Sequence, residues 1–543
     1  MIVLGLSGAH GHDPAAAIIV DGEVAAALEE ERLSRAKHAN GQLPIESARY
    51  CLEAAGIGVR EVDVVALPSA PVSLADATRF RYARRHLRAP HHAVRALLDG
   101  NRTFRRARAS VIEATEALGI DWRRTALVPV EHHLAHAASA YHFCGFEGRT
   151  AILSLDGGND YTSALFAVGD AGRITKLAAL DGRDSIAHLY GAMTAHLGLE
   201  QGDEERVLEM ATHGTASRVD LSRLLVRRGD GRLEIARRGR DLESQHAADC
   251  AAALQSSFEE SCIELIERHL GAIVRETGQL AFAGGGASNA KLCQRLLARS
   301  DVQRLFVPPA PGDAGSALGA AAFVAVNRGE RLRTMRHAYL GPGFSTAQCI
   351  EVLEVRSEKP RWRRLADVAD DAAQIIAAGH PLAWFQGRLA FGAHALGARC
   401  VLGSPSAPSI VARIDTQIGT HDRWRPVAAS VLDRVAPEMT GSKHASPFMT
   451  ATFDVTDRWR TRIPQVMRHD GSARVHTVAR EINPRFHALL EALERRTGSG
   501  VVLSVPMARR AEPIVCSPAD ALHLFYESSL EYLVLEDLLV TKS

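Results

Sequence analysis

The sequence predicts an α/β protein in two parts, a duplicated first part followed by a separate α/β domain. A chain of 543 residues is longer than one ordinary hydrophobic core accommodates, so two or three domains are expected. Similar strand-and-loop patterns begin at Val3 and at Ala151, and the pattern changes after residue 330. These observations place two related halves first and an independent domain last.

The first half opens with VLGLSGAHGHDPAAAIIVDGEVAAALEEER, in which an apolar strand enters a Gly-rich turn. Two apolar segments then flank Asp21-Gly22, which is a strong short hairpin signal. The second half repeats this order in AILSLDGGNDYTSALFAVGDAGRITKLAAL, with a polar loop around Asp156 and a hairpin turn at GDAG. The two copies lie too far apart for a solenoid repeat, so we predict two related halves that share a cleft.

Two further loops follow the second half. In LAFAGGGASN an apolar strand enters Gly284, and a helix begins near Asn289, so backbone N–H groups can approach a phosphate or adenosine closely. In PAPGDAGSALGAA, Asp313 precedes a helix of small residues, where it is also an ordinary N-cap candidate. Such loops in duplicated halves resemble the actin/sugar-kinase/Hsp70 type of nucleotide cleft. The nucleotide-binding candidates are Gly157, Gly158, Asn159, Gly284, Gly285, Gly286 and Asn289.

The composition is that of a globular protein, with 46% hydrophobic and 23% charged residues. A net charge of +1 gives no overall attraction to nucleic acid or to a membrane surface. The chain has no apolar run long enough to span a bilayer and no secretory signal at its start, which indicates a cytoplasmic protein. Its eight cysteines form no C-x-x-C pair, so neither a zinc knuckle nor a disulfide framework is expected.

The segment VEHHLAHAASAYHF gathers several of the chain's 24 histidines. His132 and His136 are four residues apart and would share one face of a helix. Asp156 and Asp313 could complete a mixed shell of two imidazoles and two carboxylates, which suits Fe²⁺, Zn²⁺ or Mn²⁺. Without an H-E-x-x-H context, the alternative is that both are ordinary interior or surface histidines.

The motifs HHLAHAASAY, LSLDGGND, AGGGASN and PAPGDAGSALGAA together resemble the NodU/CmcH-type O-carbamoyltransferases. The opening GHDPAAAIIVDGEVAAALEEERLSRAKH and the later WFQGRLAFGAHALGARCVLGSP, RWRPVAASVL and EPIVCSPADAL extend this resemblance over nearly the whole chain. The resemblance implies a TsaD-like nucleotide and metal domain at 1–335, a linker at 336–365 and a YrdC-like α/β domain at 366–543.

The same resemblance implies a reaction. ATP, with Mg²⁺, and carbamoyl phosphate would form carbamoyl adenylate in the YrdC-like domain, and the TsaD-like domain would transfer the carbamoyl group to a hydroxyl of a small-molecule natural product, as in antibiotic biosynthesis. His132, His136, Asp156 and Asp313 would hold a divalent metal, Fe²⁺ first and Zn²⁺ or Mn²⁺ as alternatives, on the adenylate phosphate. His12 would take the acceptor proton, unless it only contacts substrate or packs a loop.

Carbamoyl phosphate and a triphosphate require cations, and arginine forks suit phosphate oxygens. The resemblance places the candidates for this anion site in the second domain at Arg388, His394, Arg399, Arg425, Arg474 and Arg510. This sequence departs from the family pattern there. His394 stands where the family has arginine, Gly419 and His421 stand where basic residues are expected, and SVPMARRAEPI lacks the usual Asn, Thr and Ser. Either the histidines partly replace the lost charges, or donor activation is altered or lost.

Residues 79–108 carry ten arginines against one aspartate. Interleaved aromatic residues also occur on nucleic-acid surfaces, but a charge run is usually a solvated face. We expect a helical lid over the acceptor cleft or a dimer contact, with RNA binding as the alternative.

The leading hypothesis is therefore an ATP- and carbamoyl phosphate-dependent O-carbamoyltransferase, with a homodimer as one possible assembly and no membrane partner. The alternatives are a tRNA threonylcarbamoyl transferase, and a nucleotide-binding homologue with an altered acyl donor or without donor activation. The sequence identifies neither the acceptor nor the metal.

Overall fold

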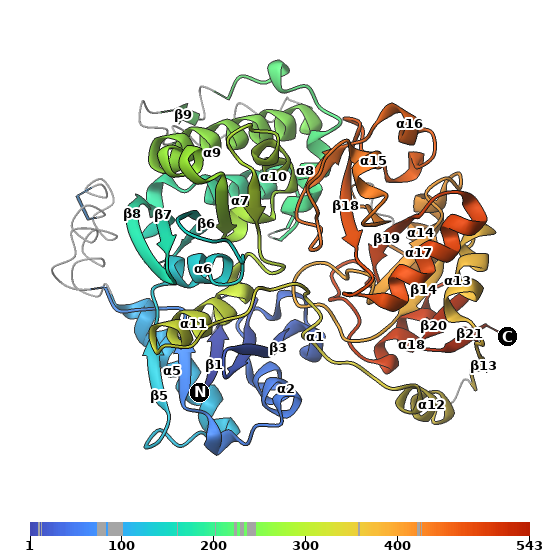
Figure 1. Ribbon diagram of the computed structural model, residues 1–543, viewed down its shortest axis with the longest axis horizontal. Coiled ribbons are helices and arrows are strands. Elements are labelled where there is room, and N and C mark those ends of the chain that lie inside the picture. The colour runs from blue at the N-terminus through green and yellow to red at the C-terminus, as the bar shows by residue number, and fades with distance from the viewer. Residues whose placement is uncertain are drawn as a thin grey trace. The chain divides into compact units, whose positions relative to one another are not determined.

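The computed structural model spans residues 1–543 and describes all of them except 9–10, 12, 73–82, 85–100, 160, 201, 222–224, 228–232, 236–245, 357–358, 421–423, 425 and 543. It divides into two compact units (Figure 1). The first unit contains Met1–Glu30 and His38–Met335, and the second contains Glu31–Lys37 and Arg336–Ser543. A short segment from near the N-terminus thus belongs to the C-terminal unit.

The first sheet of the first unit begins with the predicted strand and hairpin. Its five strands follow the order β3-β2-β1-β4-β5. They are β1 (Ile2–Ser7), β2 (Ala15–Val20), β3 (Glu23–Glu29), β4 (Val64–Leu67) and β5 (Ala126–Pro129). The hairpin between β2 and β3 closes through Asp21 and Gly22, both with positive φ, as a two-residue turn requires.

The second sheet repeats this topology. Its order, β12-β11-β6-β7-β8, again places two antiparallel strands on one side of the first strand and two parallel strands on the other. The strands are β6 (Thr150–Asn159), β7 (Thr162–Asp170), β8 (Arg173–Asp181), β11 (Gln279–Ala283) and β12 (Arg304–Phe306). Ala171 and Gly172 close its hairpin with the same positive φ values. The repeated strand order confirms the predicted duplication of the first part of the chain.

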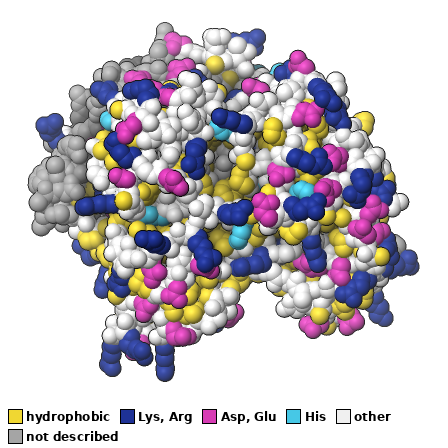
Figure 2. All heavy atoms as spheres, viewed as in Figure 1, with side chains coloured by type: hydrophobic (Ala, Val, Ile, Leu, Met, Phe, Trp, Pro, Cys, Tyr) yellow, Lys and Arg dark blue, Asp and Glu magenta, His cyan; other side chains and the backbone are white. Residues whose placement is uncertain are grey.

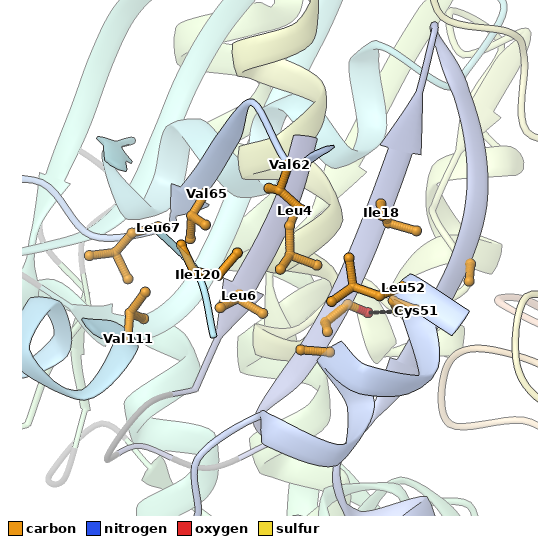
Figure 3. Packing of buried hydrophobic residues seen from close by; sticks show 13 residues of the cluster. Leu4, Leu6, Ile18, Cys51, Leu52, Val62, Val65, Leu67, Val111 and Ile120 are labelled. Carbon is orange, nitrogen blue, oxygen red and sulfur yellow. Dashed lines mark hydrogen bonds between the residues drawn. The ribbon is translucent and has the colours of Figure 1, made fainter. Parts of the chain in front are cut away.

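Helices cover both sheets. In the first unit they are α2 (Ile45–Ala55), α5 (Arg102–Leu118), α6 (His132–Tyr141), α7 (Ile186–His196), α8 (Glu204–Ala211), α9 (Ala247–Thr277), α10 (Ala290–Leu297) and α11 (Asp313–Asn327). A small additional ribbon pairs β9 (Leu225–Arg227) with β10 (Leu233–Ile235). Helices α2 and α5 close the core of the first sheet, where Cys51 donates to the Ala16 carbonyl and Val111 and Leu4 are fully buried (Figure 3).

Helices α6 and α11 pack between the two sheets (Figure 1). Small residues make this close packing possible. A Cβ atom on Gly5 of β1 would lie 2.0 Å from the Ala317 carbonyl oxygen, and one on Gly319 would lie 1.9 Å from that of Ala135 in α6. The Gly- and Ala-rich sequence of α11 is therefore structural, and it fixes where the first residue of that helix, Asp313, lies.

The second unit is built on a mixed sheet in which nine strands of the described chain follow the order β13-β21-β20-β14-β15-β19-β16-β18-β17. These strands are β13 (Arg361–Arg364), β14 (Leu382–Phe385), β15 (Arg399–Gly403), β16 (Ala428–Leu432), β17 (Thr452–Asp454), β18 (Ser472–Val478), β19 (Val501–Pro506), β20 (Tyr532–Leu535) and β21 (Leu538–Thr541). Its helices are α1 (Glu31–Ser34), α12 (Thr346–Glu354), α13 (Val368–Ala377), α14 (Ile410–Ile418), α15 (Ala436–Thr440), α16 (Asp457–Arg460), α17 (Pro484–Thr497) and α18 (Pro518–Glu527).

The segment 336–365, predicted as a linker, has structure of its own in the second unit. It contains helix α12, which begins with a capping box at Ser345 and Gln348, and strand β13, which pairs with β21. The prediction relied on its few apolar residues, but an edge strand needs backbone pairing rather than two apolar faces.

Three features of composition can be compared with the structure. All eight cysteines are buried free thiols. In the described part of the chain, no helix is long and apolar enough to cross a membrane. Acidic and basic side chains are interspersed on the face seen in Figure 2, in keeping with a net charge of +1.

Of the arginine-rich segment 79–108, only residues 83–84 and 101–108 are described. Arg102, Arg106 and Arg108 lie exposed on the first turns of α5. The predicted lid, dimer contact or RNA surface otherwise falls outside the described residues.

Candidate metal and nucleotide site

The histidines of helix α6 divide into two groups by the face they occupy. His132 and His136 lie one turn apart, with ring centroids separated by 4.5 Å and planes nearly perpendicular at 88°. His133 points elsewhere, since its Nδ1 lies 3.0 Å from the Ser154 hydroxyl and its Nε2 lies 3.0 Å from the Thr162 carbonyl oxygen. Burial lowers the pKa of His133 to about 3, so it is a neutral structural histidine.

Two aspartates from distant parts of the chain meet the first pair of histidines. Asp156 lies near the end of β6, and Asp313 begins α11. His132 Nε2 is 3.0 Å from Asp156 Oδ2 and 3.5 Å from Asp313 Oδ1. His136 Nε2 is 3.6 Å and 3.5 Å from the same two oxygens. The structure thus brings together the four side chains that the sequence proposed as metal ligands.

The electrostatics of this cluster favour positive charge at its centre. Burial opposes protonation of His136, but its hydrogen bonds to Asp156 and Asp313 outweigh that cost and raise its pKa to about 9. Burial alone would raise the pKa of Asp156. The hydrogen bonds to His132 and His136 outweigh burial and hold the Asp156 pKa well below its usual value. The Nε2 atoms of His132 and His136 lie 3.1 Å apart. Two nitrogen lone pairs repel each other at this distance, so both can point into the cluster only if a cation lies between them.

The donor set fits a divalent metal ion. Metal bonds of about 2.0–2.2 Å to imidazole and carboxylate place tetrahedral ligand atoms roughly 3.3–3.6 Å apart. The ligand atoms of the cluster all lie within 4.8 Å of one another, and the imidazole–carboxylate distances above run from 3.0 to 3.6 Å. His136 Nδ1 is buried without a hydrogen-bond partner among the described residues, so its ring is held by packing rather than by an outer acceptor.

The Gly-rich loop after β11 touches this cluster directly. The N–H of Gly285 donates to Asp156 Oδ1 at 3.0 Å. Gly284 has φ +86°, and a Cβ there would lie 2.2 Å from the Leu155 carbonyl oxygen. Only glycine permits this approach, which places the loop beside one proposed metal ligand. Gly157 and Gly158 follow Asp156 in β6, and Gly286 packs on Leu155.

Asn289 has a structural role that the sequence analysis did not assign. It caps helix α10, because its side chain accepts from the Leu292 N–H at 2.9 Å. Its amide also forms a reciprocal pair with Gln255 of α9, at 3.0 and 2.9 Å. Gln255 further accepts from the Tyr190 hydroxyl and donates to Glu259. This buried network anchors the end of the glycine loop.

The other predicted residues of this site lie partly outside the described chain. His12, the proposed acceptor base, is not among the described residues, and neither is the side chain of Asn159. The neighbouring Asp13 is described, and its Oδ1 lies 2.8 Å from His38 Nδ1.

The residues of the predicted anion site in the second unit differ from one another in burial and in hydrogen-bond partners. Arg399 is fully buried and donates to the carbonyl oxygens of Gln386, Ala398, Pro342 and Gly387, and it stacks on Phe385 at 3.5 Å. Burial lowers its pKa to about 10. The backbone thus engages the donors of Arg399 in this structure, and its binding of phosphate stays a prediction.

Arg388 is exposed, and its guanidinium donates to the carbonyl oxygens of Leu340 and Gly341. Arg510 is exposed in a turn, and Arg425 lies outside the described residues. Arg474 is buried on β18 and donates to the Met449 carbonyl oxygen through Nε.

Four buried polar residues of the sheet in the second unit, Arg474, Thr452, His476 and Ser430, form a stripe across it. In the strand pairing, Arg474 of β18 lies opposite Ala428 of β16 and Thr452 of β17. His476, two residues after Arg474 on β18, lies opposite Ser430 of β16. Burial, followed by the charge of His394, lowers the pKa of His476 to about 3. The sequence analysis named Arg474 and His394 but not His476 and Ser430, whose side chains lie 3.1 Å apart between β18 and β16.

Comparison with known proteins identifies the family of this chain. The chain matches the family model Carbamoyltransferase N-terminus over residues 2–233 and 231–322, and Carbamoyltransferase C-terminus over residues 373–542. The chain belongs to the carbamoyltransferase family. This carbamoyltransferase is 33% identical to the nodulation protein NolNO of Sinorhizobium fredii, over 98% of this chain and 79% of that protein.

A second relative of this carbamoyltransferase is the uncharacterized protein sll1178 of Synechocystis sp., at 31% identity over 100% of this chain and 97% of the relative. Among solved structures, HypF in its phosphate- and nucleotide-bound form aligns with a TM-score of 0.36 and 14% identity, over 61% of this chain and 56% of that one. The ROK hexokinase from Thermus thermophilus aligns with a TM-score of 0.30 and 16% identity, over 61% and 100%.

Proposed function

We propose that this carbamoyltransferase is an ATP-dependent O-carbamoyltransferase that uses carbamoyl phosphate and acts on a hydroxyl of a small-molecule natural product. The observation that carries the proposal is the convergence of His132, His136, Asp156 and Asp313 beside the Gly285 N–H. Membership of the family supplies the group that is transferred. In this proposal the phosphate of an adenylate would bind beside the cluster and the glycine loop.

The donor reaction is assigned to the second unit, where Arg474, His394 and Arg510 are the candidates for binding the two phosphate compounds. Carbamoyl phosphate is cleaved by water to carbamate and inorganic phosphate. A carbamate oxygen then bonds to the α-phosphorus of ATP, and the bond from that phosphorus to pyrophosphate breaks. The products are carbamoyl adenylate, pyrophosphate and phosphate.

The transfer reaction is assigned to the first unit. The acceptor oxygen bonds to the carbamoyl carbon, and AMP leaves with the oxygen that joined that carbon to phosphorus. His12 is the proposed base that receives the hydroxyl proton, since a neutral imidazole titrates near pH 7. Exclusion of water matters at this stage because carbamoyl adenylate hydrolyses readily.

His132, His136, Asp156 and Asp313 would hold the divalent ion, for which Fe²⁺ is our first assignment and Zn²⁺ or Mn²⁺ the alternatives. When bound, the ion would stabilise the phosphate charge as AMP departs. Gly285 would keep Asp156 oriented through its N–H, whether or not a nucleotide is present.

The donor reaction can be tested without knowing the acceptor. The full chain is incubated with ATP, Mg²⁺ and carbamoyl phosphate, with and without Fe²⁺, and pyrophosphate release is measured. We expect release that depends on carbamoyl phosphate. Release of no pyrophosphate under any metal, together with calorimetry that shows nucleotide binding but no carbamoyl phosphate binding, would contradict the proposal and favour a homologue with a changed or lost donor.

The transfer reaction is tested by adding ¹⁴C-labelled carbamoyl phosphate and a panel of sugars, polyketides and unmodified tRNA. The expected result is AMP and a labelled small-molecule ester of carbamic acid. Label in tRNA instead would identify the nucleic acid as the acceptor.

A further inference from the structure

The segment ERLSRAK lies between β3 and α2 in the sequence, in the middle of the first unit. Its residues Glu31–Lys37 nevertheless belong to the second unit. Glu31–Ser34 form the short helix α1. Two of its side chains, Arg32 and Arg35, make backbone contacts with two separate loops of that unit.

Arg32 contacts the first loop. It is only 3% exposed, and its Nη2 donates to the Gly392 carbonyl oxygen at 2.9 Å. Its Nη1 lies 2.6 Å from Glu31 Oε1, and Lys37 Nζ lies 3.7 Å from the same oxygen. Burial of a guanidinium group without hydrogen-bond partners costs free energy. Arg32 therefore favours the loop conformation in which the Gly392 carbonyl oxygen faces it. Gly392 is two residues from His394.

Arg35 contacts the second loop. Its Nη1 donates to the Ile514 carbonyl oxygen at 2.7 Å and its Nη2 donates to that of Pro513 at 2.9 Å. Its Nε lies 3.7 Å from Asp520 at the start of α18. This loop follows Arg510 by three residues. The planar fork of Arg35 fixes two successive carbonyl groups, which lysine cannot do in the same geometry.

Cys516 follows the second loop directly, and its carbonyl oxygen accepts from Arg399 Nε at 3.5 Å. Burial raises the pKa of the Cys516 thiol to about 11, and the charges of Arg399, Arg35 and Arg32 act against that shift. The segment 31–37 therefore joins the loop that carries His394 to the loop that carries Arg510.

We propose that Arg32 and Arg35 are positioning residues of the donor site, which hold the His394 loop and the Arg510 loop in the arrangement that binds carbamoyl phosphate. The inference rests on the proposed function, because it assumes that these two loops bind the donor. It implies that seven residues encoded within the transfer domain form part of the donor-activating domain.

The test uses the full chain and measures pyrophosphate release as a function of carbamoyl phosphate concentration, without acceptor. The variants are Arg35→Gln, Arg35→Lys and Arg32→Gln. The control is Arg49→Gln, an exposed arginine of α2 that pairs with Glu46 at 3.5 Å. For Arg35→Gln we expect the KM for carbamoyl phosphate to rise at least about tenfold, the value for loss of roughly 1.4 kcal/mol of binding, with a smaller change in kcat.

Arg35→Lys should recover only part of this loss, and metal bound per chain should stay at the wild-type value in all variants. If kcat falls in step with thermal stability while the KM is unchanged, the segment is merely structural and the inference is overturned. Wild-type KM and kcat in both Gln variants would overturn it as well. Should the wild-type chain itself release no pyrophosphate, the proposed function fails first, and the variants are not needed to show it.

Discussion

The His/Asp cluster of the first unit and the arginines of the second unit were predicted from the same kind of motif, but their side chains have different surroundings in the structure. His132, His136, Asp156 and Asp313 converge on one point. Arg399, by contrast, turns all its donors to backbone carbonyls. Two carboxylates gathered in a buried place repel each other unless positive charge lies between them, whereas the donors of a buried arginine can be satisfied by backbone carbonyl groups.

The largest expected effect tests the cluster side of this comparison. Asp313→Asn should lower bound metal to less than about one tenth of an ion per chain and slow carbamoyl transfer by roughly a thousandfold, or about 4 kcal/mol. Metal content by plasma mass spectrometry and product formation provide the measurement. His142→Asn is the matched control, since His142 lies in the same motif but at the end of α6, away from the cluster. Equal metal loss in both variants would argue against the assigned ligands.

The next effect separates a structural arginine from a ligand arginine. Arg399→Met should destabilise the second unit by about 3–5 kcal/mol, because five carbonyl contacts lose a buried partner. Arg510→Met should leave the free energy of unfolding within about 0.5 kcal/mol and should raise the KM for carbamoyl phosphate instead. Urea unfolding and pyrophosphate release measure the two quantities. If instead Arg399→Met raised the KM and Arg510→Met lowered the stability, Arg399 would be the ligand arginine and Arg510 the structural one.

Gln255 tests whether the polar network supports the glycine loop. Gln255→Leu should cost about 2–3 kcal/mol of stability, since Asn289 and Tyr190 lose their buried partner. Nucleotide affinity should fall as well, because the loop between Gly284 and Asn289 loses its anchor. Asn327→Leu is the comparison, since the exposed Asn327 side chain donates to the Phe323 carbonyl oxygen within α11 at 2.8 Å. Calorimetric titration with ADP at 10 °C, once circular dichroism has shown both proteins to be folded, gives the affinity. An unchanged affinity would limit the role of the network to stability.

The smallest effect concerns acid stability and distinguishes the buried neutral histidines from the cluster. Burial lowers the pKa of His476 to about 3, from an ordinary value of 6.5. Above pH 6.5 the ring is neutral in both states and its stability contribution is complete. Below pH 6.5 only the unfolded chain takes up the proton, so stability falls by about 1.4 kcal/mol per pH unit until the pH reaches the folded pKa.

His476→Asn should therefore flatten the loss of stability between pH 6 and pH 4 by about that slope, as measured by urea midpoints at each pH. An identical pH dependence in wild type and variant would mean that His476 is protonated in the folded chain.

The sequence alone determined the duplicated topology and the residue types of the cluster. Strand and turn patterns are local, so the hairpins at Asp21-Gly22 and Ala171-Gly172 and the glycine loop could be predicted from short segments. The spacing of His132 and His136 likewise follows from the helical period. The motifs further supplied Asp156 and Asp313 as candidates, although they lie far apart in the chain.

Only the tertiary structure decided which candidates face a site and which support the fold. His133 and Arg399 belong to the same motifs as their neighbours, but one points at Ser154 and the other at backbone carbonyls. The attachment of residues 31–37 to the second unit also has no local signal. Helical and strand periods fix which residues share a face, whereas packing between distant elements fixes what that face meets.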